Sequence, residues 1–160
     1  MTDPPAADLA FRARALAQAH PLSAAVQRIV NRAVADEGRA QPLQEAGVWA
    51  GAALTQGYCL RKVEEAVTGI ASEAEQGLAI GDDELERIAA EVAAGLRQGS
   101  GDDVTIAALD LLVGSQVEHR LDQWRDELDA SAWDELEQYL TWWVVKGYAL
   151  RRAEMPAAVR

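Results

Sequence analysis

One eight-residue stretch of this chain occurs twice, with ninety residues between equivalent positions. The two copies read Gly57-Tyr58-Cys59-Leu60-Arg61-Lys62-Val63-Glu64 and Gly147-Tyr148-Ala149-Leu150-Arg151-Arg152-Ala153-Glu154. Five of the eight paired positions are identical, and the pair Lys62 and Arg152 keeps its positive charge. A single repeat of this kind predicts an internal duplication, in which two parts of the chain fold alike, and not an array of many units.

The composition favours an all-α fold. Hydrophobic residues make up 49% of the chain and charged residues 26%, which is typical of a globular protein. Alanine is abundant, and no run alternates β-branched and polar residues as a half-buried strand does. We therefore expect a single helical domain over residues 1–160, since a chain of 160 residues is long enough to bury a substantial core.

Apolar spacing, prolines and glycines predict six main helices. The second begins near Pro21 or Ser23, because the residue before a proline avoids the helical region. Gly38 ends it, and Gln98-Gly99-Ser100-Gly101 is the clearest linker. The expected helices cover residues 4–20, 21–37, 42–68, 82–98, 103–128 and 131–155, with a weaker helical segment after Gly69.

The third and sixth helices carry matching apolar seams. The seam of the third is Ala46, Ala50, Ala53, Gly57, Leu60, Glu64 and Val67, and that of the sixth is Leu136, Leu140, Trp143, Gly147, Leu150 and Glu154. The alternating spacing of four and three predicts helices packed almost parallel to their neighbours. Together with a looser echo between the second and fifth helices, it predicts two duplicated hairpins, 21–67 and 103–155. These would form a pseudo-symmetric four-helix bundle flanked by helices 4–20 and 82–98.

Gly57 and Gly147 fall in the middle of their predicted helices. Glycine there costs about 1 kcal/mol relative to alanine, so its presence needs a structural reason. We expect a close crossing of these two helices at the paired glycines.

The repeated stretch also supplies a candidate ligand-binding set, Tyr58, Arg61, Glu64, Tyr148, Arg151 and Glu154. Two interpretations remain open at this point. In the first, Glu64 pairs with Arg151 and Glu154 with Arg61, and the set only stabilises the fold. In the second, the set lines a pocket between the repeats and binds a small anionic ligand.

Metal and catalytic motifs are sparse. Glu118, Asp122 and Asp126 place carboxylates four residues apart on one helix face, where they form either a solvated surface or a weak divalent-metal site. Asp82-Asp83-x-x-Glu86 resembles the acidic magnesium motifs of helical phosphate-processing enzymes, although helix capping explains it equally well. The single cysteine, Cys59, is expected to be a core residue. No catalytic residue, metal or cofactor is assigned.

Four of the five tryptophans lie between residues 124 and 143. Trp143 belongs to the predicted seam and is expected in the core. Trp124, Trp133 and Trp142 are either at the edge of the core or part of an aromatic surface for a protein partner, which includes a second copy of this chain.

The formal net charge of −11 disfavours nucleic acids and anionic membranes as partners. Residues 72–138 hold 18 acidic and four basic residues, so the ends of the chain are mildly basic. Without a signal-peptide pattern or paired cysteines, we expect a cytoplasmic location.

The first functional hypothesis is an adaptor or regulatory protein acting through protein contacts. The second is a protein that binds a small anionic ligand, and the third is a divalent-metal-dependent phosphate-processing enzyme.

Overall fold

The computed structural model describes six helices and, within the residues it describes, no strands. The described residues are 4–19, 22–40, 46–69, 81–99, 101–124 and 130–155. The helices are α1 (Pro4–Ala17), α2 (Ala24–Ala40), α3 (Ala46–Thr68), α4 (Asp82–Arg97), α5 (Asp103–Trp124) and α6 (Ala130–Glu154). The predicted all-α class is confirmed, and each predicted main helix is found within a few residues of its expected limits.

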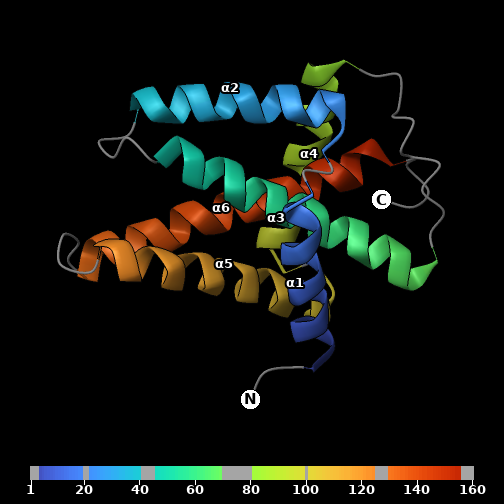
Figure 1. Ribbon diagram of the computed structural model, residues 1–160. Helices are drawn as coiled ribbons and strands as arrows, with labels where there is room; N and C mark the ends of the chain where they lie inside the picture. Colours follow the sequence, from blue (N-terminus) through green and yellow to red (C-terminus); the bar gives the residue numbers. More distant parts are fainter. Residues whose placement is uncertain are drawn as a thin grey trace.

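The two longest helices, α3 and α6, cross each other as an X at the centre of the molecule (Figure 1). Helix α3 runs back along α2, and α6 runs antiparallel to α5. Helix α1 packs on α3 and α5, while α4 packs mainly on α6 and touches α2. The expectation of nearly parallel packing is therefore wrong for α3 and α6.

Glycine explains why α3 and α6 can cross so closely. A Cβ atom built on Gly57 would lie 1.9 Å from the backbone oxygen of Val144, and one built on Gly147 would lie 1.9 Å from that of Leu54. Real Cβ atoms are never found that close to an oxygen atom, so only hydrogen fits at either position. The predicted close crossing at the two glycines is confirmed.

The core surrounds this crossing and follows most of the predicted seam. Ala50, Ala53 and Leu60 of α3 are fully buried, as are Leu140 and Leu150 of α6. The last predicted seam residue of α3 is an exception, because Val67 is 57% exposed. The seam is thus exposed to solvent in the final turn of α3, and the candidate site lies beside this end of the helix.

Helix ends are set by local chemistry. The first turn of α4 holds Asp82, Asp83 and Glu84, whose charges favour the positive end of the helix dipole. The N-cap is Gly81, which has no side-chain cap bond. At the start of α5, Asp102 accepts a hydrogen bond from the backbone N–H of Val104 at 3.1 Å. Gly99 adopts a φ of 84° directly after the end of α4, where other residues would be strained.

Candidate functional site

Two tyrosine–glutamate hydrogen bonds link α3 to α6 on one side of the crossing. The hydroxyl of Tyr58 donates to Oε1 of Glu154 at 2.6 Å, and the hydroxyl of Tyr148 donates to Oε1 of Glu64. Both tyrosines are almost completely buried. Each of these bonds joins a glutamate to a tyrosine of the opposite helix, whereas the contacts that we predicted between the repeats were glutamate–arginine pairs.

The arginine pairing differs from the prediction. Arg151 binds Glu65, not Glu64, through Nε at 2.9 Å and Nη2 at 2.7 Å. Both side chains are buried, with exposed fractions of 1% and 2%, and Nη1 of Arg151 lies 3.7 Å from Glu154. The predicted pair of Arg151 with Glu64 is wrong because Glu65, one position further along α3, faces α6.

Arg61 also lies beside these carboxylates. Its Nη1 is 3.5 Å from Glu64, and its Nε is 3.8 Å from Glu65. Its Nη2 approaches the sulfur of Met155 at 3.8 Å. The six predicted site residues are thus brought together at one place, with Glu65 as an additional member. Sequence reasoning missed Glu65 because the repeat ends at Glu64. The only signal for it was its spacing of four residues from Arg61.

Burial raises the pKa of both bridging tyrosines, and the neighbouring carboxylates raise it further. The pKa of Tyr148 rises to about 12, with Glu64 as its charged neighbour, and that of Tyr58 rises above its ordinary value next to Glu154. Burial alone would lower the pKa of Arg151, but its hydrogen bond to Glu65 and the charge interactions with Tyr58, Glu65 and Glu154 together raise the pKa above its ordinary value. At neutral pH the tyrosines are therefore neutral donors to the carboxylates.

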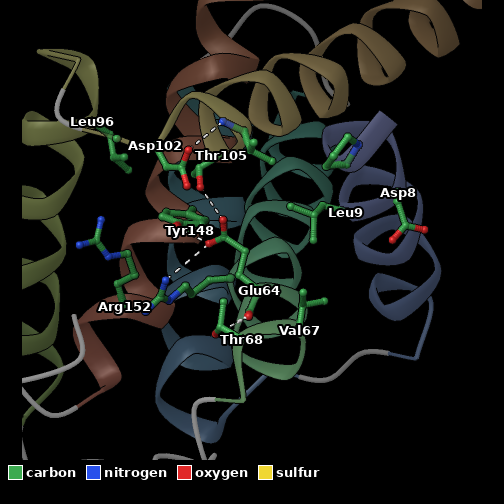
Figure 2. Close-up of a pocket in the computed structure, with 14 residues that line it drawn as sticks. Asp8, Leu9, Glu64, Val67, Thr68, Leu96, Asp102, Thr105, Tyr148 and Arg152 are labelled. Atoms are coloured by element: carbon green, nitrogen blue, oxygen red, sulfur yellow. Dashed lines mark hydrogen bonds and ion pairs between the residues drawn. The ribbon is translucent and has the colours of Figure 1, made fainter. Parts of the chain in front are cut away.

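A cavity of about 510 Å³ opens next to Tyr148 (Figure 2). We call it the Tyr148 cavity. Glu64 lies in its wall and accepts a second hydrogen bond from the hydroxyl of Thr105 at 2.5 Å. Helices α1, α3, α4, α5 and α6 all contribute to it. Its lining residues are Pro5, Asp8, Leu9, Arg61, Glu64, Val67, Thr68, Leu96, Gly101, Asp102, Val104, Thr105, Tyr148 and Arg152.

The two tyrosine–glutamate pairs differ in access. Tyr148, Glu64 and Arg61 line the cavity, whereas Tyr58 and Glu154 are buried and do not. Both copies of the repeated stretch therefore contribute polar groups to the cavity, Arg61 and Glu64 from the first copy and Tyr148 and Arg152 from the second.

Arg152 is a further lining residue that the prediction left out of the site. Its guanidinium lies 5.9 Å from the centre of the Tyr148 ring. Its Nε is buried and has no hydrogen-bond partner among the described residues. The repeat gave a signal for it, since the basic character of Lys62 is kept at Arg152, but it did not show which of the two faces a cavity.

The other predicted sites are only partly described. The side chains of Asp122 and Trp124, and the whole of Asp126, lie outside the described residues. Glu118 is exposed, and no group of three potential metal ligands occurs within the described part of the chain. Cys59 is buried, and burial raises the pKa of its thiol to about 12, as expected for a core residue.

Two of the candidate interface tryptophans are described. Trp142 is 42% exposed, and its ring meets that of buried Trp143 edge to face. The ammonium group of Lys146 lies 5.0 Å from the centre of the Trp142 ring. Trp133 is half-buried and packs against the core. Of the two candidates described, Trp142 is therefore the exposed one.

None of the helices, over the residues described, has the length and apolar character needed to cross a membrane. No protein-family model, curated protein or solved structure matches this chain.

Proposed function

We propose that this protein binds a small anionic molecule in the Tyr148 cavity, with Arg152 as the main anion-binding group. The observation that supports this most strongly is the state of Arg152, whose Nε is buried at the cavity wall without a partner among the described residues. Arg152 lines the cavity, is only partly buried and has no ion pair among the described residues, so the rest of its guanidinium can pair with a bound anion. The cavity volume of about 510 Å³ is in the range of small-molecule sites.

The formal charges of the cavity wall do not by themselves favour an anion, because Asp8, Glu64 and Asp102 oppose Arg61 and Arg152. The contacts of these groups change the balance. Asp8 pairs with Arg12 at 3.0 Å, and Asp102 accepts the N–H of Val104. Glu64 is held by Tyr148, Thr105 and Arg61. Among the described residues, Arg152 and Asp102 are therefore the two charges of the wall without an ionic partner, and of these only Arg152 can donate hydrogen bonds to an anion.

Tyr148 and Glu64 serve this proposal as positioning residues. The bond from Tyr148 to Glu64 fixes the tyrosine ring, and the fixed ring gives the guanidinium of Arg152 a surface to stack on. A planar guanidinium held in one orientation suits a carboxylate or phosphate, because two parallel hydrogen bonds can form.

A ligand screen by thermal unfolding tests the proposal. The probes are acetate, hexanoate, benzoate and inorganic phosphate, each at increasing concentration. We expect at least one to raise the unfolding temperature of the native protein, since a ligand at 100 times its Kd stabilises by about 2.7 kcal/mol. Arg152→Gln should remove this stabilisation.

Lys62→Gln is the matched control, because Lys62 occupies the equivalent position of the other copy and does not line the cavity. It should leave the effect of the anion unchanged. The proposal fails if no probe stabilises the protein, or if both variants lose the effect equally.

A role in protein contacts is a second proposal, favoured by the exposure of Trp142. Exposed tryptophan next to a cation is typical of interface anchors. If the protein forms a homodimer through this surface, Trp142→Ser should shift sedimentation at micromolar concentration toward the monomer. Phe11→Ser, which changes another exposed aromatic residue on α1, should not. A native protein that sediments only as a monomer would remove the homodimer version of this proposal.

We also propose that the two halves of the chain arose by duplication. Support comes from the repeated stretch and from the matched roles of Gly57 and Gly147. Helices α1 and α4 add to it, since Ala6, Ala10 and their counterparts 83 residues later, Ala89 and Ala93, are all buried. That interval equals the one between the similar parts of α2 and α5, so the duplicated unit would contain three helices. More closely matching halves in related sequences would support this, and their absence from all relatives would count against it.

A further inference from the structure

The wall of the Tyr148 cavity is chemically uneven. Figure 2 shows Tyr148, Thr105 and Arg152 on one side, on α5 and α6. Leu9 of α1 and Val67 of α3 lie on the other side, where the one charged residue among the described lining residues is Asp8, which pairs with Arg12. Apolar Leu96 lies on the side of Arg152. A molecule that fills the cavity would therefore meet polar groups with one part and an apolar wall with another.

Val67 leaves part of this apolar wall exposed to solvent. It is one of the few large hydrophobic side chains that are exposed among the described residues, at 57%, although it continues the buried seam of α3. Leu9 is buried and lines the same cavity. A ligand tail lying against Val67 would remove apolar surface from water, which stabilises binding by about 25 cal/mol per Å².

From this arrangement we infer that the ligand class is an amphipathic anion, with a carboxylate-like head at Arg152 and an aliphatic tail between Leu9 and Val67. The inference rests on the proposed function and adds the tail to it. The head displaces the water around Arg152 and Tyr148, and the tail covers the apolar wall. A small anion without a tail would use only half of the cavity.

A chain-length series tests the tail. We would measure Kd by isothermal titration calorimetry for acetate, butanoate, hexanoate and octanoate, each below its micelle-forming concentration. Full burial of a methylene group improves affinity about fourfold. The cavity is partly open, so octanoate should bind at least about tenfold more tightly than butanoate. Val67→Ser should reduce this ratio by about threefold or more.

Val48→Ser is the control, because Val48 is an equally exposed valine on α3, at 62%, and does not line the cavity. It should leave the ratio unchanged, and neither substitution removes a buried side chain. If all four carboxylates bind with similar Kd values and binding still depends on Arg152, the inference about the tail is wrong while the proposed function stands. If none binds but phosphate does so through Arg152, the tail is again overturned. Failure of every anion overturns both.

Discussion

Each of the three tyrosines of this chain donates its hydroxyl hydrogen to a glutamate on another helix. Tyr58 and Tyr148 bridge α3 and α6, and Tyr139 donates to Glu37 of α2 at 2.8 Å. Burial raises the pKa of all three, and the acceptor carboxylate raises it further. The phenols are therefore held in the neutral form that the carboxylates need.

This arrangement predicts a loss of stability at alkaline pH. An unfolded tyrosine ionises near pH 10, whereas folded Tyr148 does so near pH 12. Between these values the native state binds more protons than the unfolded state, so its stability falls as pH rises. The contribution of these tyrosines to the free energy of unfolding is fully present below about pH 10. We expect a decline on the order of 1 kcal/mol per pH unit for each tyrosine, measured by urea unfolding.

Tyr148→Phe should make this decline shallower, and at neutral pH it should cost about 1–2 kcal/mol for the lost bond to Glu64. Tyrosinate absorbance of the native protein should stay low until the protein unfolds. A native protein whose tyrosines all ionise near pH 10 would contradict the hydrogen bonds described here.

The buried pair of Arg151 and Glu65 makes a second prediction at this scale. Arg151→Met should lower the free energy of unfolding by about 3–5 kcal/mol, because it removes the cation that binds buried Glu65 at 2.7 Å and lies beside buried Glu154. Chemical denaturation measures this loss. Arg87→Met, which breaks exposed pairs with Glu84 and Glu91 on α4, should have little measurable effect. If both variants lost a similar free energy of unfolding, the buried Arg151–Glu65 pair would not stabilise the fold more than an exposed pair does.

At the scale of helices, the close crossing of α3 and α6 depends on glycine at positions 57 and 147, where only a hydrogen atom fits in place of a Cβ. Gly57→Ala and Gly147→Ala should each destabilise the protein by about 3 kcal/mol or more in thermal or urea unfolding, because the backbones must separate. Gly114→Ala is the control, since it changes a mid-helix glycine of α5 with nothing within 4 Å of the new Cβ. It should instead stabilise by about 0.5–1 kcal/mol. Tolerance of alanine at Gly57 and Gly147 would contradict the crossing.

The helices and this crossing were predictable from sequence, but the angle of the crossing was not. The cost of glycine inside a helix points to Gly57 and Gly147 as places of close approach. The seam spacing alone suggested nearly parallel helices, as in a coiled coil. Small residues at the centre of both seams let the backbones touch, so α3 and α6 diverge on either side and cross as an X (Figure 1).

The cluster of tyrosines, arginines and glutamates was predictable, but its internal pairing and the lining residue Arg152 were not. The repeat identified the tyrosines and glutamates that meet between α3 and α6. It could not reveal Glu65, whose equivalent position in the second copy is Met155. The choice between Glu64 and Glu65 as the partner of Arg151 depends on the rotation of α3 at the crossing, which only tertiary packing determines.

At the scale of the whole molecule, the sequence offered a pocket between the repeats as one of two alternatives, but it could not predict where the cavity opens. Two matching stretches predict two similar environments, but the one around Tyr58 is closed and the one around Tyr148 is open. The difference arises from the ends of α1, α4 and α5, which approach Tyr148 without filling the space between them. Among the described residues, Arg152 lines the open side and has no ion pair, which is why the proposed anion site is placed there.

Nuclear magnetic resonance of the ¹⁵N-labelled protein during titration with hexanoate tests this central claim most directly. We predict saturable shifts that are largest for the side-chain Nε–H of Arg152 and the backbone amides of Thr105 and Tyr148. Arg152→Gln should abolish them, and the indole N–H of exposed Trp142 should not move. Shifts centred on Trp142 and Lys146, or a drift at many positions that never saturates, would contradict a ligand site in the Tyr148 cavity.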